Sequence, residues 1–247
     1  MNAKHGKFLI AVAIPVIVAA VPGVAFAACV ITDPPKWDPS VSVPRTATIG
    51  YGTVIGPGVT ISKYVSIGTC GQIGIDGNGG SLSANAKVGD NVIMENGSGL
   101  STHAHIGNDA RIDGSKIGSY ANVGEGSTIT GSTISSKTTV GAGVMFTNSR
   151  TSTSTNIGSN SNVADSRFSQ YAHTGIDAKL TGVYFGYKGG IGDNVTIATG
   201  TKVESYAHVD TGVTIVDNVY IGSHAHVCAD IITSGMYIAS RTSYGCP

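Results

Sequence analysis

The sequence is poor in charged and in aromatic residues. Asp, Glu, Lys and Arg make up 12% of its 247 residues, and aromatic residues make up 6%, with a single Trp. Charged residues alone are about a quarter of a typical soluble domain. The 15 basic and 15 acidic residues give a formal net charge of zero, which argues against nucleic acid as a partner. Because so few rings cannot fill a wide core, we expect a narrow interior lined by small aliphatic residues.

Common catalytic motifs are also missing. The chain has no G-x-S-x-G motif, no P-loop and no paired-carboxylate motif. We therefore name no catalytic residue, and the sequence favours a protein that is not an enzyme.

The N-terminal segment, residues 1–27, has the pattern of a cleavable signal peptide. Lys4 and Lys7 form a positive n-region, residues 8–21 are apolar, and residues 25–27 read Ala-Phe-Ala, a typical cleavage site. The mature chain would start after this site and be exported. We expect it outside the cell or on the cell surface, with the periplasm as an alternative.

Two other interpretations of this segment stay open. A retained membrane anchor would keep the apolar stretch, although Pro15 and Pro22 weaken a spanning helix. The run Phe26-Ala27-Ala28-Cys29 is similar to a bacterial lipobox, with Phe in place of the usual Leu. A lipid anchor on Cys29 is therefore the second alternative.

Aliphatic residues recur every six positions through much of the remaining chain. Gly often follows them, and a small or β-branched residue often stands four positions later. A fixed internal period of this kind is the mark of a repeat architecture. The aliphatic positions are Ile49, Ile55, Ile61, Ile67 and Ile73, then Leu82, Val88, Met94, Leu100, Ile106 and Ile112, and later Ile191, Ile197, Val203, Val209, Ile215, Ile221 and Val227.

This pattern resembles the hexapeptide-repeat family, [Ile/Leu/Val]-Gly-x-x-[Ser/Thr/Ala/Val]-x, over residues 45–235. The resemblance implies an all-β fold, the left-handed parallel β-helix, in which each hexapeptide forms one side of a triangle and about 18 residues make one coil. We expect about eleven coils of 17–18 residues over residues 46–230. Irregular caps are expected at the N-terminus, residues 28–45, and at the C-terminus, residues 231–247.

Between residues 114 and 191 the period changes to 17 residues. The run Gly114-Ser115-Lys116-Ile117 recurs at residues 131–134, 148–151 and 165–168, and in degenerate form at residues 182–185. One side of the triangle is therefore expected to be one residue short in these coils.

Four cysteines follow the predicted signal peptide: Cys29, Cys70, Cys228 and Cys246. An even number in an exported chain indicates disulfides, and four cysteines allow three pairings. Cys228 and Cys246 are 18 positions apart, the length of one coil, so one lies over the other if the tail continues the helical path. We favour Cys228–Cys246, with Cys29–Cys70 fastening the N-terminal cap. Lipidation of Cys29 would remove the second bridge.

All six His residues beyond the signal peptide fall on one side of the expected triangle. Residues i and i+2 of a strand share a face, and imidazole is a good ligand for zinc, copper or nickel. His208 precedes His226 by 18 positions, and Tyr206 precedes His224 by 18, so each pair should stack in adjacent coils. The motif is [Tyr/His]-Ala-His, at residues 103–105, 171–173, 206–208 and 224–226.

Two interpretations of this His side stay open. In the first, it holds zinc or copper, although no cofactor is required by the rest of the sequence. In the second, stacked rings simply cover the sheet. The candidate metal ligands are Tyr206, His208, His224 and His226, with His103 and His105. The candidate surface ladder is Tyr64, Tyr120, Tyr171 and His173.

A second row of outward residues stands one position before the inward residues on one side of the triangle, such as Ile117, Val203 and Ile221. It offers positive charge and tyrosine rings to anionic glycans or lipid headgroups, or it is a solvated ridge that keeps other strands away. Its members are Lys116, Arg150, Arg167, Tyr184, Lys202 and Tyr220.

Two enzyme classes share the fold that the resemblance implies. The γ-class carbonic anhydrases bind zinc through His residues between trimer subunits, but their Arg/Asp/Gln second shell and His spacing have no counterpart here. Hexapeptide acyltransferases use acetyl-CoA or acyl carrier protein, donors that an exported chain is not expected to meet. A reaction inferred from the fold alone would rest on analogy.

We therefore expect an exported structural or surface β-solenoid. It would be a self-assembling filament, matrix or cell-surface subunit, or an adhesion subunit. The alternatives are a metal-binding enzyme of the γ-carbonic-anhydrase type, a hexapeptide acyltransferase and a glycan-binding module. The expected partners are further copies of the chain, stacked end to end or as a homotrimer, and a glycan or cell surface.

Overall fold

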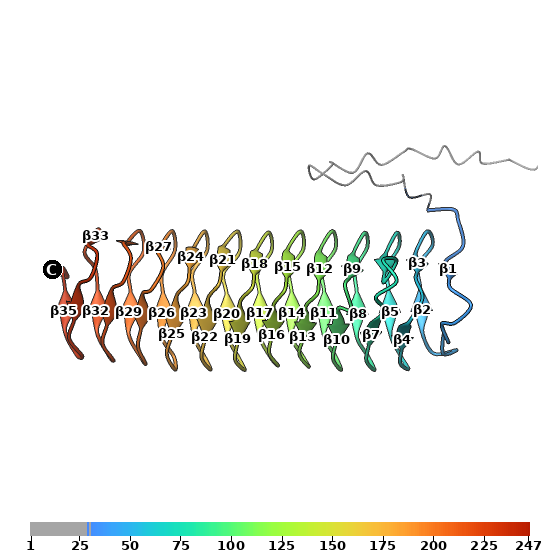
Figure 1. The fold of residues 1–247 in the computed structure, drawn as a ribbon, viewed down its shortest axis with the longest axis horizontal. Coiled ribbons are helices and arrows are strands. Elements are labelled where there is room, and N and C mark those ends of the chain that lie inside the picture. The colour runs from blue at the N-terminus through green and yellow to red at the C-terminus, as the bar shows by residue number, and fades with distance from the viewer. Residues whose placement is uncertain (1–28, 30) are drawn as a thin grey trace, which may run out of the picture.

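The structure is a computed structural model that describes Cys29 and residues 31–247. The predicted signal peptide lies outside the described residues. The described chain forms a left-handed parallel β-helix, a straight rod with three long sheets (Figure 1). None of its described segments forms a helix long and apolar enough to cross a membrane.

Each coil contributes one short strand to each of three sheets, and every strand pairs in parallel with the strands of the coils before and after it. Sheet A contains β1 (Lys36–Trp37), β3 (Val54–Ile55), β6 (Gln72–Ile73), β9 (Ile93–Glu95), β12 (Arg111–Asp113), β15 (Thr128–Thr130), β18 (Met145–Thr147), β21 (Asn162–Ala164), β24 (Lys179–Thr181), β27 (Thr196–Ile197), β30 (Thr214–Ile215) and β33 (Ile231–Ile232). Sheet B contains β2 (Thr48–Ile49), β5 (Ser66–Ile67), β8 (Lys87–Val88), β11 (His105–Ile106), β14 (Asn122–Val123), β17 (Thr139–Val140), β20 (Asn156–Ile157), β23 (His173–Thr174), β26 (Gly190–Ile191), β29 (His208–Val209), β32 (His226–Val227) and β35 (Ser243–Tyr244). Sheet C contains β4 (Val59–Ile61), β7 (Gly80–Leu82), β10 (Gly99–Leu100), β13 (Lys116–Ile117), β16 (Thr133–Ile134), β19 (Arg150–Thr151), β22 (Arg167–Phe168), β25 (Tyr184–Phe185), β28 (Lys202–Val203), β31 (Tyr220–Ile221) and β34 (Tyr237–Ile238).

The C-terminal segment differs from the expectation of an irregular cap. Strands β33, β34 and β35 extend sheets A, C and B in register with the preceding coil. The segment stays regular because Ile232 and Ile238 continue the inward aliphatic columns and are fully buried. Sheets A and B therefore have 12 strands each, where about eleven coils were expected from the repeat.

The N-terminal segment is regular only in part. Strand β1 pairs with β3, so that Lys36 lies beside Val54 and Trp37 beside Ile55. Val41 is buried against the core. The rest of residues 31–45 forms turns and irregular backbone, as expected for a cap over the first coil.

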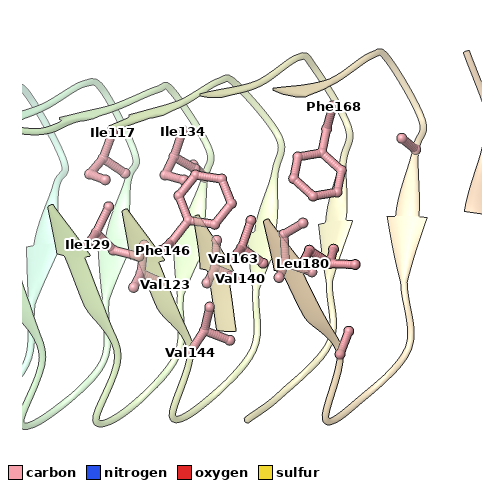
Figure 2. Packing of buried hydrophobic residues seen from close by; sticks show 14 of the residues in the cluster. Ile117, Val123, Ile129, Ile134, Val140, Val144, Phe146, Val163, Phe168 and Leu180 are labelled. Atoms are coloured by element: carbon pink, nitrogen blue, oxygen red, sulfur yellow. The ribbon is translucent and has the colours of Figure 1, made fainter. Parts of the chain in front are cut away.

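The core is a narrow column of inward side chains that runs the length of the rod (Figure 2). It consists mainly of Ile, Val, Leu and Ala, as the scarcity of aromatic residues predicted. Three phenylalanines fill the central part: the rings of Phe146 and Phe168 lie 6.2 Å apart, and those of Phe168 and Phe185 stack at 4.8 Å. Burying each such side chain stabilises the fold by about 1.5–3 kcal/mol.

The 17-residue coils lose their residue at the corner between sheets A and C. Strand β12 ends at Asp113 and β13 begins at Lys116, so only Gly114 and Ser115 make the turn. The serine column at this corner links successive coils: the Ser115 hydroxyl accepts the N–H of Ser132 at 3.0 Å and donates to the Asp113 carbonyl at 2.8 Å. The same bonds recur at Ser132, Ser149 and Ser166.

Both expected disulfides are present. Cys29 bonds to Cys70 with the Cα atoms 5.7 Å apart, and Cys228 bonds to Cys246 with the Cα atoms 4.8 Å apart. The first bridge fastens the cap to an early coil, and the second joins the last two coils. Because one thiol cannot carry both a bridge and a lipid, the bridge at Cys29 and lipidation at Cys29 exclude each other.

Candidate functional site

The [Tyr/His]-Ala-His motifs lie at the corner between sheets C and B. The first residue of each motif sits in the turn, with φ between 60° and 61° for His103, Tyr171, Tyr206 and His224. The last residue begins a strand of sheet B, as for His105 on β11 and His208 on β29. The expectation that both side chains share one strand face is therefore wrong, since the left-handed turn separates them.

The turn residues form a stacked row of rings along this corner. As expected, the Tyr206 and His224 rings stack, with centroids 4.7 Å apart and planes at 12°. His103 stacks on Tyr120 in the same way, at 4.7 Å and 5°. A second group runs edge to face from Tyr171 through Tyr187 to Tyr206, at 5.7 Å and 5.5 Å. Tyr64 and Tyr120 are exposed on the same corner.

The strand residues of the last coils converge on one carboxylate. His208 and His226 lie side by side on the paired strands β29 and β32, with ring centroids 5.5 Å apart and tilted by 46°. An Asp210 carboxylate oxygen lies 3.3 Å from Nε2 of His208 and 2.7 Å from Nε2 of His226. One ligand atom from each of the three residues lies within 4.8 Å of the others, so the trio can hold a cation.

Asp210 is the ligand that the sequence-based interpretation missed. Asp210 stands directly after the inward residue of its sheet-B strand. Ten of the twelve coils have Gly at the equivalent position, the first being Gly50 and the last Gly245. Along most of this column a side chain would collide with the next coil: a Cβ atom on Gly124 would lie 2.5 Å from the backbone N of Ala142. Asp210 and Cys228 are the two exceptions to glycine in this column. Their departure from the glycine pattern is the feature of the sequence that could have identified Asp210 as a candidate ligand.

The remaining predicted ligands lie elsewhere. Strand β11, which carries His105, is six strands away from β29 in sheet B, or roughly 29 Å at the usual strand spacing. His105 instead places Nδ1 2.9 Å from the amide oxygen of Asn122. His103, Tyr206 and His224 belong to the corner row. The predicted set is therefore split, and of its members only His208 and His226 belong to the cluster around Asp210.

His173 lies near this cluster on the same face. Gly190 stands between it and His208 in the column, and the His173 ring extends over this glycine. The rings of His173 and His208 are 6.3 Å apart. Partial burial, and then the charge of nearby His208, lower the pKa of His173.

A second group of potential ligands, His226 with Cys228 and Cys246, has a different role. The two sulfur atoms are joined in the disulfide, so neither offers a thiolate to a metal. Nε2 of His226 lies 3.6 Å from the Cys228 sulfur, which places the bridge directly beside the His-Asp-His trio.

The basic row predicted from the sequence crosses sheet C from β13 to β31, and the structure adds Tyr237 on β34. Each member is the outward residue of its strand, in register with the next. A polar depression surrounds its centre, lined by Gly131, Thr133, Asn148, Ser149, Arg150, Asp165, Ser166 and Arg167.

Comparison with known proteins finds solved structures of low similarity. No protein-family model matches the chain, and no curated protein matches it. Similar solved structures include the UDP-N-acetylglucosamine acyltransferase from Campylobacter jejuni, at 13% identity and a TM-score of 0.31, covering 72% of this chain and 66% of that one. LpxA from Acinetobacter baumannii, at 15% identity and a TM-score of 0.34, has the same coverage.

The UDP-N-acetylglucosamine acyltransferase from Francisella novicida is similar at 18% identity and a TM-score of 0.21, covering 83% of this chain and 66% of that one. The chain thus spans just under two thirds of the length of these three proteins. At these identities and TM-scores, no property and no active-site residue of these proteins is carried over to this chain.

Proposed function

We propose that the protein is an exported adhesion or matrix subunit, a rigid rod that binds an anionic polysaccharide along sheet C. The observation that supports this proposal is the row of cations and tyrosines on seven of eight successive strands, with Thr133 at the remaining position. From β13 to β34 its members are Lys116, Thr133, Arg150, Arg167, Tyr184, Lys202, Tyr220 and Tyr237.

The spacing of the row suits a linear polymer. Adjacent strands lie about 4.8 Å apart, so eight strands present one side chain at each step over roughly 34 Å. Arg150 and Arg167 are direct neighbours on β19 and β22. Guanidinium groups bind carboxylates and sulfates in a bidentate manner, and tyrosine rings offer flat apolar faces to sugars.

The cations of the row are available for such a ligand. Lys116, Arg150, Arg167 and Lys202 are exposed, and none of them forms a salt bridge to an acidic group within the described residues. Asp165 lies in the lining of the central depression. Desolvation, and then the charge of Glu204, raise the pKa of Tyr220.

Export is part of the same proposal. Two disulfides in a chain of this size are typical of an oxidising compartment, and they agree with the signal-peptide pattern of residues 1–27. A surface or matrix subunit would also associate with further copies, end to end or as a homotrimer. Light scattering on the mature chain measures that state directly.

The binding proposal is tested with two purified probes, heparin and polygalacturonate, by titration calorimetry. The double variant Arg150→Gln, Arg167→Gln should bind roughly tenfold more weakly, since each exposed charge pair contributes up to about 1 kcal/mol. Affinity of the unmodified chain should also fall with added salt. The matched control is Lys87→Gln, Lys179→Gln, which removes two exposed charges from sheets B and A.

The outcomes separate the interpretations clearly. Equal losses in both double variants would mean that net charge, rather than the row, attracts the polymer. An unmodified chain that binds neither probe at low salt would leave the row as a solvated ridge and overturn the proposal.

An acyltransferase is the alternative function, because enzymes of that activity share the hexapeptide-repeat fold. A fold alone does not assign a reaction, so the test is direct. Transfer of an acetyl group from acetyl-CoA to an amino sugar by the purified chain, abolished in His224→Gln or His103→Gln, would replace the adhesion proposal.

A further inference from the structure

We propose that His208, Asp210 and His226 form a binding site for a divalent transition-metal ion of the zinc or copper class. The site lies on sheet B near the C-terminal end, whereas the polysaccharide row lies on sheet C. It therefore stands independently of the proposed function.

The ligand types and their spacing both fit such an ion. Two imidazoles and one carboxylate are a common ligand set for zinc and copper. Ligand atoms bound tetrahedrally at about 2.0–2.1 Å lie roughly 3.3–3.4 Å apart. Asp210 Oδ1 and His208 Nε2 are already 3.3 Å apart, and Asp210 Oδ1 and His226 Nε2, now 2.7 Å apart, need to separate by roughly 0.6–0.7 Å.

The backbone holds these three ligands in place. His208 and His226 are in-register partners on β29 and β32, and Asp210 follows His208 by two residues, so its side chain leaves the same face of the strand. Hydrogen bonds from His208 N to the Ala225 carbonyl and from Asp210 N to the Val227 carbonyl bracket the pair, at 2.9 Å and 2.8 Å. These backbone bonds fix the two strands, so the ion has to move only side chains to complete its coordination.

The glycine column indicates that Asp210 has a specific use. Elsewhere along this face the position after the inward residue is Gly, because a Cβ atom would press on the following coil. Cys228, the other exception, carries the disulfide. Asp210 instead places its carboxylate between two imidazoles.

The site is open to an incoming ion. The side chains of His208 and His226 are each 45% exposed and that of Asp210 is 40% exposed. Three protein ligands leave at least one coordination position free for water or an external group. The competing explanation is a simple ion pair, in which Asp210 only orients the two rings.

The experiment measures Zn²⁺ binding to the mature, disulfide-bonded chain by titration calorimetry and by metal content after dialysis. We expect about one zinc per chain, and at least a 100-fold loss of affinity in Asp210→Gly and in His226→Gln, since even second-shell changes cost 10–100-fold. Asp210→Gly is the sharper variant because it restores the residue that the column has elsewhere, so the fold should tolerate it.

Two matched controls keep the assignment specific. His224→Gln removes an imidazole of the corner row and His105→Gln removes one on strand β11 of sheet B. Both residues lie outside the trio, and both variants should bind zinc as the unmodified chain does. Zinc should raise the melting temperature of the unmodified chain and of the controls, but not that of Asp210→Gly.

Three results would overturn the proposal: a metal-free chain with no measurable zinc affinity, unchanged affinity in Asp210→Gly, or an equal loss in His224→Gln. The first would leave the trio as an ion pair. Loss of metal would not affect polysaccharide binding on sheet C, so the two proposals fail separately.

Discussion

At the scale of single residues, the interior is too narrow for its side chains to be interchangeable. Each side of a coil buries two residues, the inward strand residue and a mostly small residue two positions before it, and both stack in columns along the rod. Thr151 shows how sensitive this column is. It takes an inward position between Ile134 and Phe168, and its hydroxyl oxygen, instead of a backbone carbonyl, accepts the N–H of Ser135 at 2.9 Å. The buried hydroxyl is accommodated because it finds partners, the Ser135 N–H and the Thr138 hydroxyl at 3.3 Å.

Phe168 is the core residue whose replacement should destabilise the protein most. It is fully buried and stacks on Phe185. Phe168→Ala should lower the free energy of unfolding by about 3–5 kcal/mol, because a coil of fixed width cannot close over the cavity. Phe168→Leu should cost much less. Chemical denaturation measures both, with Tyr120→Ala at the exposed corner as a control that should change stability by less than about 1 kcal/mol.

At the scale of the coil, the turns restrict which residue can occupy a position as strongly as the strands do. Each corner between sheets C and B uses a non-glycine residue at positive φ, from Tyr64 to Arg241, whereas the position after ten of the twelve sheet-B strands is glycine for a different reason. There the backbone of the next coil leaves no room for a Cβ atom. A second kind of glycine, such as Gly126, lies at positive φ in the turn between sheets B and A. The two kinds should respond differently to substitution.

Gly124 and Gly126 test this difference within three residues. A Cβ atom on Gly124 would lie 2.5 Å from backbone atoms of the next coil, while one on Gly126 meets nothing within 4 Å and only its φ of 66° opposes a side chain. Gly124→Ala should destabilise the protein by about 3 kcal/mol through this overlap. Gly126→Ala should cost about 1 kcal/mol through backbone strain. Equal melting temperatures for the two variants would refute this explanation of the column.

The elements were predictable wherever periodicity decides them. The six-residue spacing indicated the strands of all three sheets, and the change to 17 residues indicated a shortened side, because both follow from one inward residue per strand. The spacing of Cys228 and Cys246 indicated their bridge for the same reason. The C-terminal coil was missed because Met236 and Tyr244 replace the usual small or aliphatic residues there, although Ile232 and Ile238 continue the pattern.

Only some residues of the candidate sites could be predicted from the sequence. Sequence spacing places residues in a column, but it does not show which way a side chain leaves a turn. The pairs at residues 103–105 and 224–226 were therefore expected to share a face, and the positive φ at His103 and His224 separates them. Asp210 escaped notice since a single acidic residue has no periodicity of its own. It stands out only against the glycines of its column.

At the scale of the whole molecule, a rod of twelve coils has a one-dimensional stability. Each coil touches only its neighbours, so the stability is close to a sum of coil and interface terms, and the end coils, with one neighbour each, contribute least. The two disulfides act at these ends: Cys29–Cys70 ties the cap to the early coils, and Cys228–Cys246 ties the last coil to the one before it. The covalent bonds therefore lie where non-covalent packing is weakest.

Removal of one bridge should consequently loosen one end only. A disulfide that closes a loop of this length stabilises by about 3 kcal/mol, so the variant Cys228→Ser, Cys246→Ser should expose β33, β34 and β35 to faster amide hydrogen exchange. Strands β15 to β21, near the middle of the rod, should keep their protection, because fraying is confined to coils near the freed end. Hydrogen-exchange mass spectrometry on the oxidised variant, beside the intact chain, measures this gradient. Uniformly faster exchange along the rod would mean that the coils unfold as one cooperative unit and that the bridge stabilises the molecule as a whole.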